Sequence, residues 1–182
     1  MGGASRWWLH HALISLNESL SGKLNIFQGD PQQILGQLAQ QTSATAVMWN
    51  RCYEPWRIAR DGNIKLALKE LDIQVDSFNG SLLWEPWQVL KKDETPYKVF
   101  TPYYRRGCLF KMPPRRPLPI PANLQVVPLS KHSVSVDSLQ LLPSIPWDTE
   151  MKERWDISEE AAQDRLDEFV LAELEDYREG RN

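Results

Sequence analysis

The sequence predicts an α/β protein with a partial doubly wound, Rossmann-like parallel sheet, followed by an irregular linker and a terminal helix. Two observations predict this fold. Helical and strand-like apolar patterns alternate over the first 78 residues, and a proline-rich stretch follows them. Such alternation favours parallel strands joined by crossover helices. We expect residues 1–112 to form the α/β part, residues 113–157 an extended linker and residues 158–182 the terminal helix.

Three helices and three strands are expected in the α/β part. The helices are predicted at residues 5–20, from Pro31 onward and at 56–71, and the strands at 24–28, 44–50 and 72–78. In the first helix, Ser5 is the expected N-cap, and one apolar stripe at three- and four-residue spacing is expected to face the core. The stripe consists of Trp8, Leu9, Ala12, Leu13, Leu16 and Leu20.

The linker and the last helix follow from local chemistry. Residues 113–122 hold five prolines, which fix φ and lack an amide donor, so the chain should be extended there. Ser158 can cap the terminal helix, and acidic side chains after it suit the positive end of the helix dipole.

Composition limits the function classes. The 182 residues carry a net charge of −3 and are 42% hydrophobic, and no apolar run approaches the ~20 residues that span a bilayer. No signal peptide is recognisable, so we expect a cytoplasmic protein without a membrane partner. Cys52 and Cys108 form no disulfide or metal pattern, and the three histidines, His10, His11 and His132, form no metal-binding group. We predict no catalytic residue and no metal site.

Three stretches together resemble the DNA photolyase/cryptochrome family. They are YEPWRIARD at 53–61, YKVFTPYYRR at 97–106, and LLPSIPW at 141–147 followed by the Trp155 segment and the final helix. Their order and spacing are similar to the family's N-terminal α/β (antenna-chromophore) domain and the start of its linker. The Lys-Val-Phe-Thr-Pro core is the most specific piece.

The resemblance implies a function for the parent protein. In this flavoprotein family the α/β domain holds an antenna chromophore, a deazaflavin or a folate. A separate helical domain binds FAD and damaged DNA and repairs pyrimidine dimers with light. The resemblance implies a parent activity of deoxyribodipyrimidine photo-lyase and a chain that does not include the FAD and catalytic domain. We therefore expect a fragment that is inactive alone and at most binds an antenna chromophore.

Family members begin with a strand carrying a WFRRDLR-like motif, then a helix and a second strand, and this sequence has none of these. It thus resembles a domain truncated at both ends. Without those central strands, three outcomes are open: strand 24–28 pairs with strand 44–50, the chain dimerises through an exposed edge, or it folds poorly as a gene remnant. We favour the first, because a βαβ crossover between these strands has a suitable length.

The candidate antenna contacts are Cys52, Glu54, Trp56 and Arg57. They follow a strand, at the sheet edge where open α/β folds bind ligands. Glu54-Pro55 agrees with deazaflavin-binding members, whereas Trp56-Arg57 replaces the Asn-Glu pair of folate-binding members. In the alternative interpretation, Glu54 and Arg57 only cap and pair at a helix start.

The segment Tyr103–Arg106, with Arg115 and Arg116, mixes aromatic rings and cations that can contact nucleic acid. We do not expect this fragment to bind DNA, because the family's DNA contacts lie mainly on the other domain. The alternative is a solvated face with Phe100 and Tyr103 packed on the sheet. Two other functions remain open: an interaction module completed by a separately encoded N-terminal segment or FAD domain, and a small nucleotide-binding α/β protein.

Overall fold

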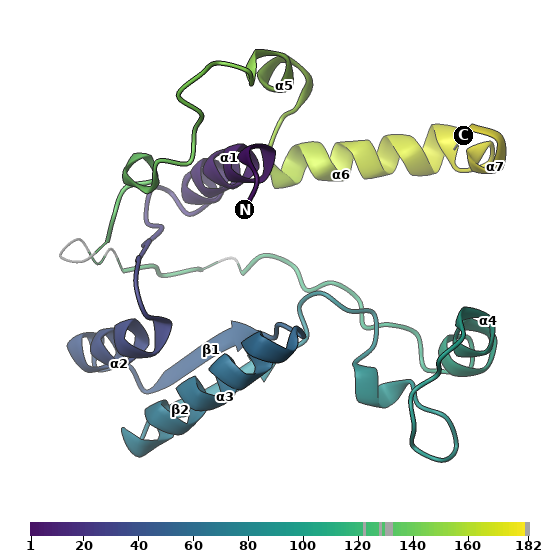
Figure 1. Cartoon of the computed structure of the whole chain (residues 1–182), viewed down its shortest axis with the longest axis horizontal. Coiled ribbons are helices and arrows are strands. Elements are labelled where there is room, and N and C mark those ends of the chain that lie inside the picture. Colours follow the sequence, from purple (N-terminus) through teal and green to yellow (C-terminus); the bar gives the residue numbers. More distant parts are fainter. Residues whose placement is uncertain (122, 128, 130–132, 181–182) are drawn as a thin grey trace. The chain divides into compact units, whose positions relative to one another are not determined.

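The computed structural model describes residues 1–121, 123–127, 129 and 133–180 (Figure 1). The chain divides into two compact units. One comprises Met1–Gln28 with Asn123–Asn182, and the other comprises Gly29–Ala122. No helix among the described residues is both long enough and apolar enough to cross a bilayer.

The unit Gly29–Ala122 contains a βαβ arrangement (Figure 1). Its regular elements, in chain order, are helix α2 (Pro31–Thr42), strand β1 (Ala46–Asn50), helix α3 (Pro55–Glu70), strand β2 (Gln74–Phe78), a 3-10 helix (Pro86–Gln88), the short helix α4 (Phe100–Pro102) and a π-helical segment (Tyr103–Cys108). These bounds confirm two predicted helices and two predicted strands. Pro31 occupies the first turn of α2, and the Asp30 carboxylate caps that helix by accepting from the Gln33 amide at 2.9 Å.

The sheet has two parallel strands, with Val47 opposite Val75 and Trp49 opposite Ser77. The core of the unit lies between the helices and this sheet, because side chains alternate along a strand and only one face is covered. Ala39 of α2, Ile64 and Leu68 of α3 and Ile73 are buried there, with Leu35, Ala44, Val47, Trp49 and Val75 packed against them. Met48, whose side chain alternates with those of Val47 and Trp49, is exposed.

The other unit is mainly helical. It contains helix α1 (Gly3–Ser19), a 3-10 helix (Asp137–Leu139), helix α5 (Thr149–Arg154), helix α6 (Glu159–Glu168), a π-helical segment (Phe169–Glu173) and helix α7 (Tyr177–Gly180). Ser158 caps α6 by accepting from the Ala161 amide at 3.0 Å, as predicted. The prediction for Ser5 is wrong: α1 already begins at Gly3, so Ser5 lies inside the helix and Gly2 is at the N-cap.

The predicted strand at residues 24–28, and its pairing with β1, are wrong within the described part of the chain. Its backbone groups find partners elsewhere in the same unit. The Ile26 amide donates to Ser133 Oγ at 3.0 Å, and the Ile26 carbonyl accepts from the Val134 amide at 2.8 Å. The Asn25 side chain adds a bond to the Val127 carbonyl at 3.0 Å. These bonds join the segment to residues of its own unit instead of to the sheet.

Helix α1 is buried along a different line from the predicted stripe. Trp7 and His10 are buried, whereas Trp8, Leu9 and Leu16 are exposed. The reason is that the chain around residues 140–148 covers the Trp7 side: a Cβ on Gly3 would lie 3.0 Å from the Trp147 ring, and Arg6 donates to the Gln140 carbonyl. The stripe therefore predicted the helix but not its buried face.

Arg51 organises the carboxyl end of the sheet. This side chain follows β1 and bonds the Ser77 carbonyl and hydroxyl at the end of β2. It also forms an ion pair with Glu85, and its guanidinium lies 5.4 Å from the Trp87 ring centre. The second Glu85 oxygen accepts from the Tyr53 hydroxyl at 2.8 Å. Burial of the Tyr53 hydroxyl, reinforced by its bond to Glu85, raises the pKa of Tyr53 above its usual value.

Replacing Leu68 should test the assigned core. Leu68 is 1% exposed, so Leu68→Ala leaves a cavity and should lower the unfolding free energy by about 2–4 kcal/mol. Leu66, on the same helix, is 64% exposed, and Leu66→Ala should change that free energy by no more than about 0.5 kcal/mol. Urea denaturation followed by circular dichroism measures both, and equal losses would contradict the assigned core.

A second pair of variants separates the two acids at this edge of the sheet. The Glu85 side chain is 9% exposed and pairs with Arg51, so Glu85→Gln should cost about 1–3 kcal/mol. Glutamine keeps the shape and an acceptor for Tyr53, so the loss reports mainly on the charge. Glu54 is 53% exposed, and its carboxylate lies 3.7 Å from Arg57 Nε. Glu54→Gln should therefore stay within about 0.5 kcal/mol. A larger loss for Glu54 than for Glu85 would reverse these assignments.

Candidate functional site

The structure brings the four predicted antenna residues together where β1 ends and α3 begins. Arg57 is the centre of the group. Its guanidinium donates to Cys52 Sγ at 3.3 Å, its Nε lies 3.7 Å from the Glu54 carboxylate, and it lies 4.9 Å from the Trp56 ring centre. Sequence spacing thus placed these side chains correctly in one cluster at the carboxyl end of a strand. That geometry does not by itself identify a ligand.

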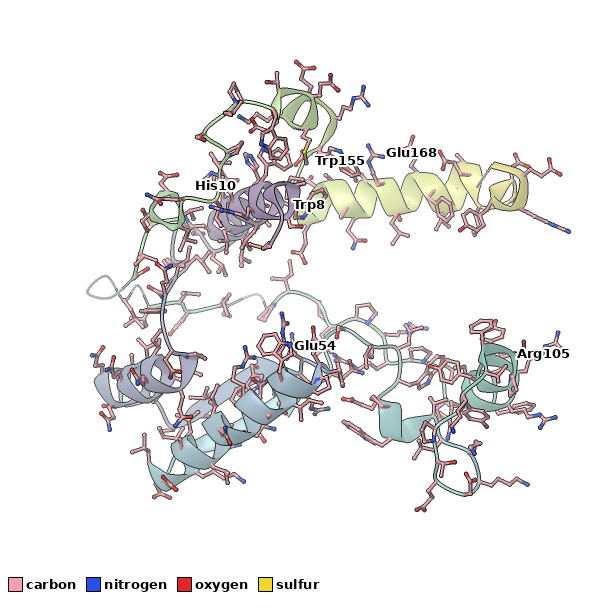
Figure 2. The ribbon with its side chains drawn as sticks, viewed as in Figure 1. Trp8, His10, Glu54, Arg105, Trp155 and Glu168 are labelled. Carbon is pink, nitrogen blue, oxygen red and sulfur yellow. The ribbon has the colours of Figure 1, made fainter. Side chains whose placement is uncertain are left out.

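Part of the alternative interpretation of this cluster agrees with the structure. Glu54 is the N-cap residue of α3 but makes no side-chain capping bond, while its ion pair with Arg57 is present. The Arg57 Nε atom is buried and has no hydrogen-bond partner in the described residues. Trp56 is 62% exposed, with Arg60 also 5.6 Å from its ring centre. The cluster therefore presents the Trp56 indole, with Arg57 and Arg60 beside it, at the surface. Glu54 marks the position of the cluster in Figure 2.

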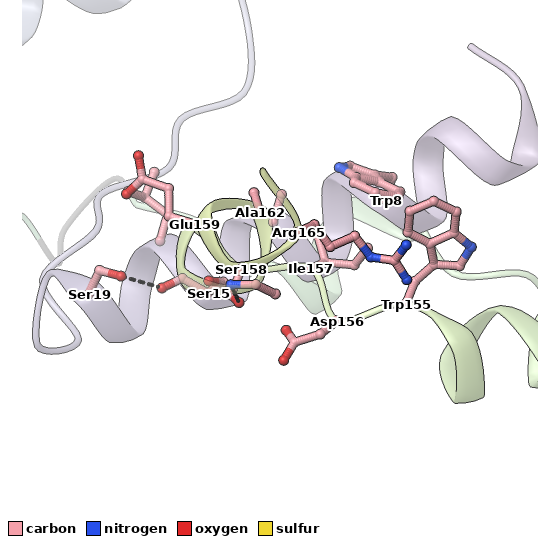
Figure 3. A pocket seen from close by; sticks show the side chains of 13 residues that line it. Trp8, Ser15, Ser19, Trp155, Asp156, Ile157, Ser158, Glu159, Ala162 and Arg165 are labelled. Carbon is pink, nitrogen blue, oxygen red and sulfur yellow. Dashed lines mark hydrogen bonds between the residues drawn. The ribbon is translucent and has the colours of Figure 1, made fainter. Parts of the chain in front are cut away.

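A hollow of about 460 Å³ lies between α1 and the start of α6 (Figure 3). Trp8 and Trp155 stand edge to face, with ring centres 5.4 Å apart, and the Arg165 guanidinium lies 5.4 Å from the Trp155 ring centre. Figure 3 shows the two indoles beside each other. The remaining wall is largely apolar, with Ala12, Leu16, Ile157, Ala161 and Ala162, and its polar groups are Ser15, Ser19, Asp156, Ser158 and Glu159.

Sequence reasoning missed this hollow. It assigned Trp8 and Leu16 to a buried stripe, and it used Trp155 only as part of the family resemblance. The available signal was the pair Trp7-Trp8: adjacent residues on a helix point about 100° apart, so both indoles cannot be buried by one neighbour. The volume lies within the range of small-molecule sites, about 300–1,000 Å³.

Arg106 of the predicted aromatic and cationic segment lines a second hollow, in the other unit. Tyr103, Tyr104, Arg105 and Arg106 form the π-helical segment, and Arg115 donates to the Asn79 carbonyl at 2.6 Å. Phe100 does not pack on the sheet: it is exposed and stacks on Tyr104, with ring centres 5.8 Å apart. The described residues contain no group of three or more metal-binding side chains, and His132 lies outside the described residues.

The DNA photolyase family model matches residues 1–122. A deoxyribodipyrimidine photo-lyase of Agrobacterium fabrum is 37% identical over 186 residues, an alignment that covers 100% of this chain and 39% of that protein. Cryptochrome-2 of Arabidopsis thaliana is 30% identical over 189 residues, covering 97% of this chain and 30% of that protein. The chain therefore spans less than half the length of these relatives.

A solved structure has the same fold as this chain. The bacterial class III photolyase from Agrobacterium tumefaciens superposes with a TM-score of 0.90 at 36% identity, covering 99% of this chain and 38% of that one. The helices and the small parallel sheet match its α/β fold, which confirms the predicted fold class. On the family match and these relatives, the chain belongs to the DNA photolyase family.

Proposed function

We propose that this chain binds a planar antenna chromophore, of the deazaflavin or folate type, as the α/β part of a photolyase- or cryptochrome-like protein. The observation that carries the proposal is the hollow between α1 and α6, whose wall presents two half-exposed indoles. Stacking on an indole face suits a planar conjugated ring.

The hollow suits a ligand that is mainly neutral at its ring. Its wall is predominantly apolar, which favours burial of an aromatic system. Arg165 lies over the Trp155 ring, so the Trp8 indole is the better candidate for ring stacking. The serine hydroxyls at positions 15, 19 and 158 could orient polar edges of the ligand.

The loop cluster remains the alternative location. Trp56 is the most exposed side chain of the four sequence candidates, and Arg57 and Arg60 beside it would attract an anionic substituent. Cys52 and Glu54 hold Arg57 in place, so in this location they act as positioning residues.

We further propose a role for this chain within a protein as long as its relatives. In a protein of their length, light absorbed by the chromophore would pass to FAD, which supplies the electron that splits a pyrimidine dimer. This chain would then contribute light capture, while other parts of the protein would bind the flavin and carry out the repair.

A second candidate function is that of an interaction module. Among the described residues, the outer edge of each strand in the two-stranded sheet is unpaired, and such a sheet is marginal alone. A separately encoded segment, an FAD domain in trans or a second copy of the chain could pair there. Analytical ultracentrifugation over a concentration series tests the last of these. A monomer at all concentrations would exclude the homodimer.

Binding of a free folate and of a free 5-deazaflavin to the full chain tests the main proposal. Fluorescence anisotropy of the compound itself should rise on binding, with no interference from the eight tryptophans. Trp8→Ala and Trp155→Ala should weaken binding by about fivefold or more, since base-like rings gain about 1–3 kcal/mol from one stacking partner. Trp56→Ala, which removes an equally large indole elsewhere, should leave binding unchanged.

The reverse pattern would move the site to the loop cluster: loss with Trp56→Ala and none with Trp8→Ala. If neither compound binds at millimolar concentration, chromophore binding by this chain is wrong. If all three variants weaken binding equally, neither proposed location is right. Circular dichroism of each variant controls for folding.

A further inference from the structure

Positive charge is concentrated in one short segment of a chain that is acidic overall. Residues 91–116 contain eight lysines and arginines and only two acids, a net charge of +6. Since the whole chain carries −3, the remaining residues carry −9. Such segregation of charge is an electrostatic signature of a surface that meets a polyanion.

Five of these eight cations line a hollow. The hollow measures about 690 Å³, and its cationic wall consists of Lys91, Lys92, Lys98, Arg106 and Lys111. Tyr97 and Phe110 add aromatic rings to the lining, and no acidic side chain of the described residues lines it. A ligand that fills it would contact both cations and aromatic faces.

Most of that positive charge is uncompensated. Lys91 pairs with Asp93 at 3.2 Å, and Asp93 is further held by Thr95, so that its pKa falls to about 2. In the described part of the chain, the other four cations of the hollow make no ion pair and no hydrogen bond. They are therefore available to an anionic ligand.

The hollow is built on a well-anchored backbone. A Cβ on Gly107 would lie 2.7 Å from Val89 and 3.2 Å from Tyr97, so the π-helical segment packs directly against these residues. On the opposite side, Leu90 and Pro96 form an antiparallel bridge, and the Lys91 amide donates to the Thr95 carbonyl at 2.9 Å. Residues of both segments, among them Leu90, Tyr97 and Arg106, line the hollow.

We propose that this hollow binds a single-stranded nucleic acid. The unpaired cations would contact its phosphates, and the exposed Phe110 ring, 82% of which is accessible, would stack on a base. The surface continues past the hollow to the exposed Arg105 and to the stacked pair Phe100–Tyr104, which suits a strand better than an isolated phosphate. An acidic peptide would satisfy the cations but offers no planar group to the rings. This proposal does not depend on chromophore binding.

Salt dependence measures the number of phosphate contacts. Fluorescence anisotropy of the full chain with a labelled 15-residue oligothymidylate gives the affinity at 50 and 200 mM KCl. Four contacts predict a loss of about 50-fold across this range, because the slope is about −0.7 for each phosphate on a single strand. The triple variant Lys98→Ala, Arg106→Ala and Lys111→Ala leaves one unpaired cation and should lose only about threefold.

The matched control removes three exposed cations outside the segment: Lys23→Ala, Lys69→Ala and Arg178→Ala. Both triple variants change the net charge equally, so only the position of the cations differs. The control should keep the wild-type salt dependence. Phe110→Ala should weaken oligothymidylate binding by at least about fivefold and leave inorganic polyphosphate binding unchanged.

Three results would overturn the proposal: the same salt dependence in both triple variants, an affinity for polyglutamate equal to that for oligothymidylate, or no effect of Phe110→Ala on oligothymidylate. A loss confined to the first triple variant, together with the Phe110 effect, supports it.

Discussion

The interactions of one guanidinium determine how the carboxyl end of the sheet is built. Arg51 leaves β1 and bonds both the backbone and the side chain of Ser77 at the end of β2. The same group pairs with Glu85, whose other oxygen holds Tyr53. A two-stranded sheet is only marginally stable by itself. The bonds of Arg51 stabilise the pairing of β1 with β2 at this end of the sheet. The loop that carries Cys52 and Glu54 lies between Arg51 and the first turn of α3, which holds Arg57.

Pairs of a cation and an indole recur in both units. Arg57 and Arg60 flank Trp56, Lys65 lies 5.6 Å from the Trp49 ring centre, and Arg165 lies over Trp155. Each pair covers part of an indole while leaving the cation hydrated, which is a favourable arrangement at a surface. The high tryptophan content therefore has two uses here: Trp7 is a packing residue, whereas Trp8, Trp56 and Trp155 present accessible rings.

The sequence allowed the βαβ part of the fold to be predicted well, because its signals are local. Proline at the start of α2, the apolar runs of β1 and β2 and the periodicity of α3 all act over a few residues. The failures come from contacts between distant segments. Residues 24–28 look like a strand, but the Ile26 amide and carbonyl are bonded to Ser133 and Val134, over 100 positions away. The buried face of α1 depends in the same way on residues near Trp147.

The candidate sites also differ in whether local sequence signals or contacts between distant segments form them. Cys52, Glu54, Trp56 and Arg57 lie within six residues, so one loop brings them together, and sequence was sufficient to group them. Trp8 and Trp155 are far apart in the sequence and come into contact only in the folded chain, so no local sequence pattern predicts this contact. The basic hollow is intermediate: its cations are visible in the sequence, but their arrangement along the hollow requires the packing of Gly107 on Tyr97.

The two hollows differ in charge, and this difference argues for two different ligands. The hollow between α1 and α6 includes Asp156 and Glu159 and a single cation, Arg165, which is already engaged with Trp155. A polyanion there would meet two carboxylates. The hollow of the other unit has cations and no acid in its described wall, and a neutral ring there would leave them unused. Because desolvating an unpaired charge is costly, each ligand should prefer the hollow that complements it. A planar chromophore and a phosphodiester strand could therefore bind the same chain without competing.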